Sequence, residues 1–257
     1  MANGYTGYWG VPTADMDFCE PNYATSHLVA EFWNTITSIP IVLVGICGMV
    51  LCHVQELGGE QMLAYAMVGV IGVGSFLFHA TLMRTGQILD EVPMLWATLV
   101  LVYTIYHHTL DRSRRQQRGD RTRMTSRLTL IGAGLFVYAA AATYLYFTTG
   151  FLGFIIAYGL SVLITFLLAL SSFLSASSGV GQQPRRMLIC AGTVYGAGFA
   201  LLWLPGELLC HRIPIIQRLP LHALFHLTSA AGPHLGLTAV RWADRIRMTF
   251  ACSHKLP

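Results

Sequence analysis

Seven stretches of about 20 mostly apolar residues constrain this chain more than any other feature. They cover residues 32–52, 62–82, 88–106, 128–147, 151–174, 187–204 and 221–240. A helix of that length spans the hydrocarbon core of a bilayer, and stretches this uniformly apolar do not suit barrel strands. Charged residues make up only 11% of the chain, against about 25% in a soluble domain. The sequence therefore predicts an all-α, polytopic membrane protein, a bundle of seven transmembrane helices.

The predicted helices divide the chain into three parts. Residues 1–31 form an acidic luminal segment, residues 32–242 the transmembrane bundle, and residues 243–257 a cytoplasmic tail. The first part has no Lys or Arg and contains Asp15, Asp17, Glu20 and Glu31. A signal peptide begins with basic residues instead, so we do not expect this segment to act as one.

The basic residues predict the orientation of the bundle. With seven spans the termini lie on opposite sides, and 13 of the 16 Lys and Arg residues fall on the side of the C-terminus. The others are Arg84, Arg212 and Arg218. Cytoplasmic loops carry the excess of Lys and Arg in membrane proteins. The N-terminus is therefore predicted to be luminal or extracellular, and the C-terminus cytoplasmic.

Polar residues gather at one depth of the predicted bundle. His79, Asp90, Glu91, His222 and His226 all lie within about two helical turns of the luminal boundary. His222 and His226 are four residues apart, so they share one face of their helix. With His79 as a third ligand, they would form an open zinc site whose fourth position takes a water molecule. The alternative is that each is an ordinary hydrogen-bonded packing histidine.

Two further residues help to define this site. Ser75 lies one turn before His79 on the same helical face and can reach the same cavity. His234 lies eight residues beyond His226, about 12 Å along the helix. Zinc–nitrogen bonds are about 2.0–2.1 Å long, so we expect His234 to lie outside this site.

The acidic luminal segment places several oxygen donors in a short span. Asp17, Glu20, Asn22 and Glu31 have no basic residue nearby to neutralise them. Clusters of carboxylate and amide oxygens suit calcium, although the spacing is not that of an EF-hand. The alternative is a solvated acidic segment whose side chains cap helices.

Taken together, these residues resemble the alkaline ceramidase family over nearly the whole chain. The matching motifs are Gly7-Tyr8-Trp9-Gly10, Asp17-Phe18-Cys19-Glu20-Pro21-Asn22-Tyr23, Ala30-Glu31-Phe32-Trp33-Asn34-Thr35, Gly74-Ser75-Phe76-Leu77-Phe78-His79-Ala80-Thr81-Leu82, Gln87-Ile88-Leu89-Asp90-Glu91-Val92-Pro93-Met94 and His222-Ala223-Leu224-Phe225-His226. Each motif is weak alone, but the ordered combination is specific. The chain departs from the family pattern at Gly206, where an Asp is usual, and at Leu224, where aromatic residues are common.

The resemblance implies a seven-helix enzyme that hydrolyses ceramide to a sphingoid base and a fatty acid. It implies zinc bound by His79, His222 and His226, with Asp90 and Ser75 beside the water that zinc activates. It also implies a structural calcium ion, whose ligands would be Asp17, the backbone carbonyl of Phe18, Glu20, Asn22 and Glu31. The substrate would be a ceramide-type lipid in the bilayer, and the membrane that of the endoplasmic reticulum or Golgi.

These roles predict a mechanism. Asp90 would accept a proton from the water and pass it to the leaving amine, while Ser75 would help stabilise the oxyanion. Two alternatives keep the histidines and lack the hydrolysis: a zinc-containing receptor of adiponectin-receptor type, and an ion or metal transporter. A retinal-binding rhodopsin is excluded because it needs a lysine within a helix, and the only lysine is Lys255 in the tail.

The positions of the cysteines predict one disulfide. Only Cys19 and Cys210 fall in loop segments on the luminal side. The other four lie toward the cytoplasm: Cys47, Cys52, Cys190 and Cys252. An oxidising lumen permits disulfides and the cytosol does not favour them. With the family resemblance, this predicts a Cys19–Cys210 bridge rather than two free thiols.

Overall fold

The computed structural model describes residues 7–114, 121–174, 182–210 and 212–253 of the chain. Residues 1–6, 115–120, 175–181 and 211, and the last residues of the predicted tail (254–257), lie outside these ranges. Helices dominate the described residues. They are α1 (Phe32–Val54), α2 (Gly59–Thr81), α3 (Arg84–Arg114), α4 (Arg121–Thr149), α5 (Phe151–Leu174), α6 (Gln182–Gly198), the π-helix η1 (Phe199–Trp203), α7 (Leu204–Leu209), the 3-10 helix η2 (Ile216–Arg218) and α8 (Leu221–Ser253).

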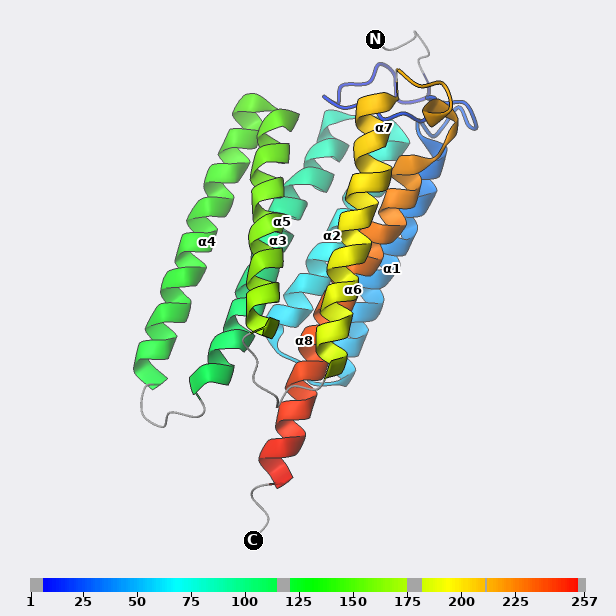
Figure 1. Ribbon diagram of the computed structural model, residues 1–257. Coiled ribbons are helices and arrows are strands. Elements are labelled where there is room, and N and C mark those ends of the chain that lie inside the picture. The colour runs from blue at the N-terminus through cyan, green and yellow to red at the C-terminus, as the bar shows by residue number, and fades with distance from the viewer. Residues whose placement is uncertain (1–6, 115–120, 175–181, 211, 254–257) are drawn as a thin grey trace.

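Six helical segments among the described residues are long and apolar enough to cross a membrane. They are Phe32–Val54, Gly59–Thr81, Arg84–Tyr106, Ser126–Thr149, Phe151–Leu168 and Gln182–Leu209. The all-helical prediction is therefore confirmed for the described residues, and the first six apolar stretches each fall in a helix. The last of these segments joins α6, η1 and α7 into one continuous rod (Figure 1). Its π-helical turn precedes Pro205, which cannot donate a backbone hydrogen bond.

The seventh apolar stretch begins α8, which differs from the other long helices. It starts at Leu221 and runs unbroken to Ser253, because residues 234–253 contain no proline and, after Gly236, no glycine. The predicted boundary between bundle and tail, at 242/243, therefore falls inside this helix. Histidines and charged residues lower its mean hydropathy, so it is not among the six segments. The seven-span count stays a prediction.

Glycines let the first three helices approach closely. A Cβ atom at Gly45 of α1 would lie 2.4 Å from the backbone nitrogen of Gly69 in α2. A Cβ atom at Gly74 of α2 would lie 2.0 Å from the backbone oxygen of Leu89 in α3. Residues without side chains at these points allow backbones to pack closely. The second contact fixes the start of α3, and with it Asp90, against the part of α2 that carries Ser75.

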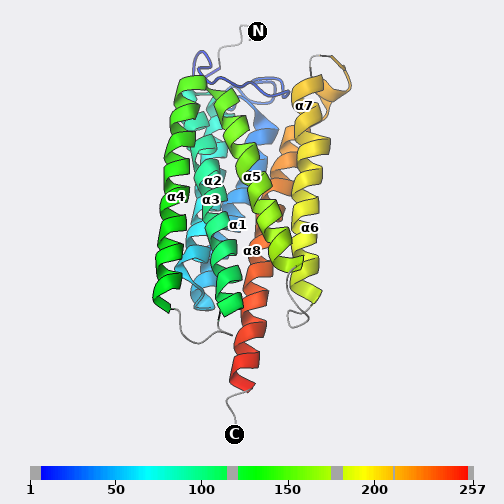
Figure 2. The same ribbon diagram turned by 60° about the vertical axis from the view of Figure 1, so that its left-hand side comes forward.

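The N-terminal segment covers the end of the bundle at which α1 begins (Figures 1 and 2). The backbone N–H of Glu31 donates to the carbonyl of His79 at 2.9 Å, and that of Ala30 donates to the carbonyl of Ala80 at 2.9 Å. Farther back, Thr13 and Ala14 both donate to the carbonyl of Leu82, at 3.1 Å each. These bonds tie the segment to the end of α2.

A disulfide joins the same segment to the loop before α8. Cys19 and Cys210 are bonded, across 191 residues of sequence, while Cys47, Cys52 and Cys190 are free. The bridge holds the N-terminal segment against the end of α7, so this segment is attached to α7 as well as to α2.

We expect peptide mapping without reduction to recover Cys19 and Cys210 in one linked pair of peptides. Removing the bridge by Cys19→Ser should lower the free energy of unfolding by about 2–5 kcal/mol, because a long loop is released in the unfolded chain. Cys190→Ser is the matched control, since this thiol is exposed and free, and should unfold as wild type does. Recovery of both thiols in free form from the native protein would contradict the bridge.

Candidate metal centre

Three buried histidines meet inside the bundle near its N-terminal end. His79 comes from the last turn of α2, and His222 and His226 from the first two turns of α8. Their ligand atoms all lie within 4.8 Å of one another. Among the described residues, this is the one group of three or more His, Cys, Asp or Glu side chains that meets this distance. The predicted triad is therefore brought together by helices far apart in sequence.

Hydrogen bonds from neighbouring groups orient two of the imidazoles. His79 Nδ1 contacts Glu31 Oε2, and His226 Nδ1 lies 3.1 Å from the backbone oxygen of Asn34 and 3.0 Å from Thr37 Oγ1. A backbone carbonyl and an ionised carboxylate can only accept hydrogen bonds. With Glu31 ionised, each Nδ1 therefore carries the proton, and each Nε2 keeps its lone pair. This is the arrangement that metal-binding histidines commonly show, with a carboxylate or carbonyl behind the ring.

The chemistry of the donor set fits a metal ion such as zinc. His79 Nε2 and His222 Nδ1 are buried and have no hydrogen-bond partner. A buried polar atom without a partner costs free energy, so two of them in one cluster indicate a missing group that accepts lone pairs. Three neutral imidazoles with one position left open are the ligand set of several catalytic zinc sites.

The ring of Phe18 covers the triad from the N-terminal segment. Its centroid lies 3.7 Å from that of His222 and 5.2 Å from that of His79. The Phe18 side chain is 9% exposed and packs with Ala30, Phe78 and Leu82. The sequence resemblance concerned only the backbone carbonyl of this residue. The structure adds its side chain, which covers the histidines on the side of the N-terminal segment.

The two predicted catalytic residues lie where α2 meets α3, on either side of the close contact at Gly74. Ser75 Oγ lies 2.9 Å from Ser38 Oγ, and Ser38 in turn donates to the carbonyl of Asn34. Since the Ser38 proton is used there, Ser75 must be the donor between the two hydroxyls. Asp90 makes no hydrogen bond to another described residue and interacts electrostatically with Glu91 and Tyr158. No described residue therefore fixes its carboxyl group through a hydrogen bond.

The acidic N-terminal residues gather around the first turn of α1. Glu20 accepts hydrogen bonds from the backbone N–H groups of Trp33 (2.7 Å) and Asn34 (2.9 Å), so it caps this helix. Asn22 Nδ2 donates to Asp17 Oδ1 at 2.9 Å. The other amide oxygen, Asn22 Oδ1, is buried without a partner. The capping alternative thus holds for Glu20, while Asp17 and Asn22 keep oxygens that a cation could use.

Glu31 stands between the acidic residues and the histidines. Its Oε1 accepts from the backbone N–H of Phe18 at 3.0 Å, and its Oε2 contacts Asn34 Nδ2 (3.0 Å) as well as His79. Burial, and to a lesser degree repulsion from Asp17, raises the pKa of Glu31 to about 8. Burial also raises the pKa of Glu20, against the backbone hydrogen bonds that lower it. Positive charge near these carboxylates would favour their ionised forms.

Four residues at this site escaped the sequence prediction. Asn34, Thr37 and Ser38 lie on one face of α1 and bond to the site residues described above. Their spacing of three and four residues, within an otherwise apolar stretch, was the available signal. Glu207 of α7 interacts electrostatically with Glu31 and Asp17. It follows Gly206, one of the two departures from the family pattern.

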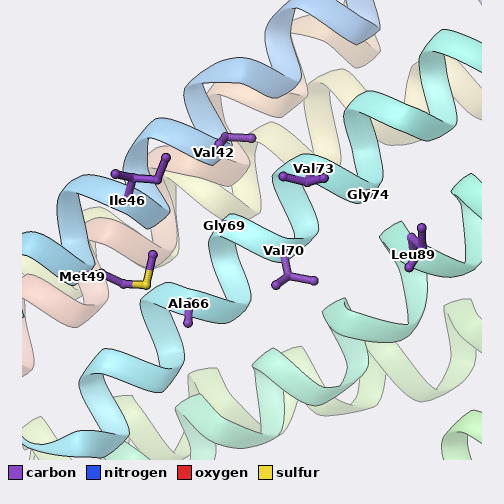
Figure 3. A pocket seen from close by; sticks show the side chains of 9 residues that line it. All are labelled: Val42, Ile46, Met49, Ala66, Gly69, Val70, Val73, Gly74 and Leu89. Atoms are coloured by element: carbon purple, nitrogen blue, oxygen red, sulfur yellow. The ribbon is translucent and has the colours of Figure 1, made fainter.

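An open apolar groove of about 400 Å³ runs between α1, α2 and α3. Figure 3 shows its lining, which is aliphatic and includes Gly74 and Leu89, the residues before Ser75 and Asp90. None of the three histidines lines it. The groove is therefore distinct from the metal centre and offers no polar group for chemistry.

Comparison with known proteins gives consistent matches. Residues 10–251 match the family model described as Ceramidase. The chain is 37% identical to an alkaline ceramidase of Arabidopsis thaliana over 41% of its length, and 38% identical to alkaline ceramidase 3 of Mus musculus over 39%. These two alignments span 42% and 38% of the relatives' own lengths. An alkaline ceramidase of Caenorhabditis elegans is 25% identical over 82% of this chain and 74% of that protein.

Proposed function

This chain belongs to the ceramidase family, and we propose that it hydrolyses the amide bond of ceramides to release a sphingoid base and a fatty acid. The observation that carries the proposal is the triad of His79, His222 and His226, two of which present buried nitrogens without partners. Zinc bound by these residues would supply Lewis-acid chemistry and a water molecule of lowered pKa. The three histidines would hold the ion, and Glu31 and Asn34 would keep two of the rings in the correct tautomer.

The remaining roles fall to residues that touch the substrate. We propose that Asp90 takes the proton of the attacking water and delivers it to the departing amine. Ser75 would turn its hydroxyl from Ser38 to the developing oxyanion of the amide, and so stabilise it. The depth of the site suits a lipid whose amide lies close to the headgroup region while its chains remain in the bilayer.

Purified protein offered a panel of ceramides, with metal analysis of the same sample, tests this function. We expect release of fatty acid and one equivalent of zinc. Zinc without turnover on any ceramide would favour the receptor of adiponectin-receptor type instead. Metal uptake into liposomes without hydrolysis would favour the transporter.

We further propose that calcium binds the acidic segment and acts through structure. The oxygens available are those of Asp17, Glu20, Asn22 and Glu31 together with the carbonyl of Phe18. Support comes from the unpartnered Asn22 Oδ1 and from the raised pKa values of Glu20 and Glu31, since a cation would compensate both features. Held in this way, the segment would keep Phe18 over the histidines.

Calcium should therefore raise both thermal stability and turnover. At a concentration 100 times its Kd, a ligand specific to the folded state adds about 2.7 kcal/mol, which raises the Tm by about 5–10 °C in a chain of this size. Asp17→Asn should abolish the response, whereas Asp15→Asn should keep it, because Asp15 pairs with Arg84 at the surface. The measurement is Tm and turnover with calcium and with chelator. If calcium changes neither quantity in the wild type, or if Asp17→Asn responds to calcium as the wild type does, the calcium site is wrong and the segment only caps α1.

The proposed membrane arrangement has seven spans, including α8, with residues 1–31 in the lumen of the endoplasmic reticulum or Golgi and the end of α8 in the cytoplasm. The positions of the basic residues and the Cys19–Cys210 bridge support it. A glycosylation acceptor sequence added before residue 7 should be modified, and one added after residue 257 should not. The reverse pattern would show that the orientation is inverted. Modification of both acceptor sequences would show that both termini lie in the lumen and that the number of spans is even.

A further inference from the structure

A second polar cluster lies in the bundle at the end opposite the metal centre. On α8, His234, Thr238 and Arg241 are spaced four and three residues apart, so they share one face. Tyr65 of α2 meets them through His234, and Tyr65 and Thr238 are each less than a tenth exposed. Arg241 lies 15 residues beyond His226, about 22 Å along the helix. The cluster therefore plays no part in the metal centre.

Arg241 carries a charge that the cluster does not neutralise. Its Nη1 is buried and has no hydrogen-bond partner. Among the described residues, Arg84 forms an ion pair with Asp15 and the neutral His79 contacts the carboxyl group of Glu31, and neither interaction involves Arg241. The groups that interact with it electrostatically are Cys52, Tyr65 and His234, none of which is ordinarily an anion at neutral pH.

The other side chains of the cluster supply further donors. Tyr65 Oη lies 3.3 Å from His234 Nδ1. The Thr238 hydroxyl is buried and lacks a hydrogen bond of normal geometry, although Tyr65 is its neighbour. A guanidinium group has five donors and no acceptor, and its planar fork matches the oxygens of a phosphate. The cluster is thus a set of donors around a cation, and the group it lacks is an oxyanion.

The depth of the cluster identifies where that oxyanion could come from. Arg241 directly follows the apolar stretch 221–240, and Arg245 and Arg247 follow within two turns of sequence. This is the level of lipid phosphates, and basic pockets between helices at this level bind anionic headgroups. Cys52 and Tyr65 belong to a buried apolar cluster with Ala64 and Leu237, so the side of the polar cluster that remains for a ligand is that of Arg241.

We propose that Arg241, Thr238 and Tyr65 bind a phosphate group at this end of the bundle. The phosphate pairs with the guanidinium of Arg241 and accepts from the Thr238 hydroxyl, which gives both groups the partner they lack. It also links α2 to α8, the helix that carries His222 and His226.

Binding to the purified full-length protein in a neutral detergent tests the proposal. Short-chain phosphatidic acid and inorganic phosphate are the two probes, and short-chain phosphatidylcholine is the neutral comparison, each titrated by calorimetry. We expect saturable binding of phosphatidic acid and not of phosphatidylcholine. Tight binding of inorganic phosphate as well would identify solution phosphate as a source, and its absence would assign the site to lipid. If neither probe shows saturable binding, the proposal is wrong.

Three variants assign the binding to this cluster. Arg241→Gln should weaken binding at least tenfold, because a charged hydrogen bond is lost, and Thr238→Val should weaken it several-fold while keeping the charge. Arg186→Gln is the matched control, since Arg186 is exposed and donates a hydrogen bond to Gln182 Oε1 at 3.3 Å. Helicity and Tm establish that each variant is folded. If both Arg241→Gln and Thr238→Val bind with wild-type affinity, the proposed site is wrong. If only Arg186→Gln weakens binding, the phosphate binds at α6 and the proposed site is also wrong.

Discussion

Replacing any one of His79, His222 and His226 by alanine should remove zinc and ceramide turnover together. The three imidazoles meet within 4.8 Å, and no other described His, Cys, Asp or Glu joins this group, so a lost ligand has no substitute. Metal ions supply several kcal/mol of transition-state stabilisation. Loss of about 5 kcal/mol corresponds to a fall in turnover of roughly 10³–10⁴-fold.

The measurement is zinc per protein and turnover on the same preparation of each variant. His27→Ala is the matched control, because His27 is an exposed histidine of the N-terminal segment outside the triad. It should keep one equivalent of zinc and normal turnover. A triad variant that keeps both would eliminate that residue as a ligand.

We expect substitution of Glu31 to have a different effect, because Glu31 contacts His79 and is also one of the proposed calcium ligands. Loss of a carboxylate behind a metal-binding histidine typically weakens metal affinity or activity by about 10–100-fold. Glu31→Gln should therefore reduce zinc affinity and the calcium response together, whereas Asp17→Asn should affect only calcium. The two proposed sites would thus share one buried carboxylate.

The sequence predicted those parts of the molecule that depend on local patterns. Uniform apolar stretches of the right length gave the six helices that could span a membrane, and the spacing of His222 and His226 placed two ligands on one face of α8. His79 was predicted as their partner because α2 and α8 both bring polar residues to the same depth. Depth along a helix follows from counting residues, so it needs no knowledge of how the helices pack.

The features of the site that the sequence did not predict depend on packing between segments far apart in sequence. Ser38 meets Ser75 across 37 residues, and His226 meets Asn34 across 192. No residue count shows which face of α1 turns toward α8. The same holds for Phe18, whose ring reaches His222 only because the N-terminal segment folds back over the bundle. The length of α8 beyond residue 242 was missed for another reason, since its charged residues end the apolar stretch without ending the helix.

Asp90→Asn should leave zinc bound and reduce turnover by about 10²–10⁴-fold, the usual contribution of a general acid–base group. The substitution keeps the size of the side chain and removes its ability to take a proton. Asp90 makes no hydrogen bond to another described residue, so an amide in its place leaves no partner unsatisfied. Folding and zinc content should therefore match wild type, and the defect should appear in kcat.

Glu91→Gln is the matched control for this prediction. Glu91 is the next residue of α3, but it turns toward another set of side chains. Its Oε1 accepts from Gln87 at 3.0 Å, and its charge interacts with Arg84, Asp15 and Tyr146. Glu91→Gln should therefore keep zinc and most of the turnover, because it leaves the proposed base in place. If Asp90→Asn turns over at the wild-type rate while Glu91→Gln does not, the proton passes through Glu91, and Asp90 has no part in the chemistry.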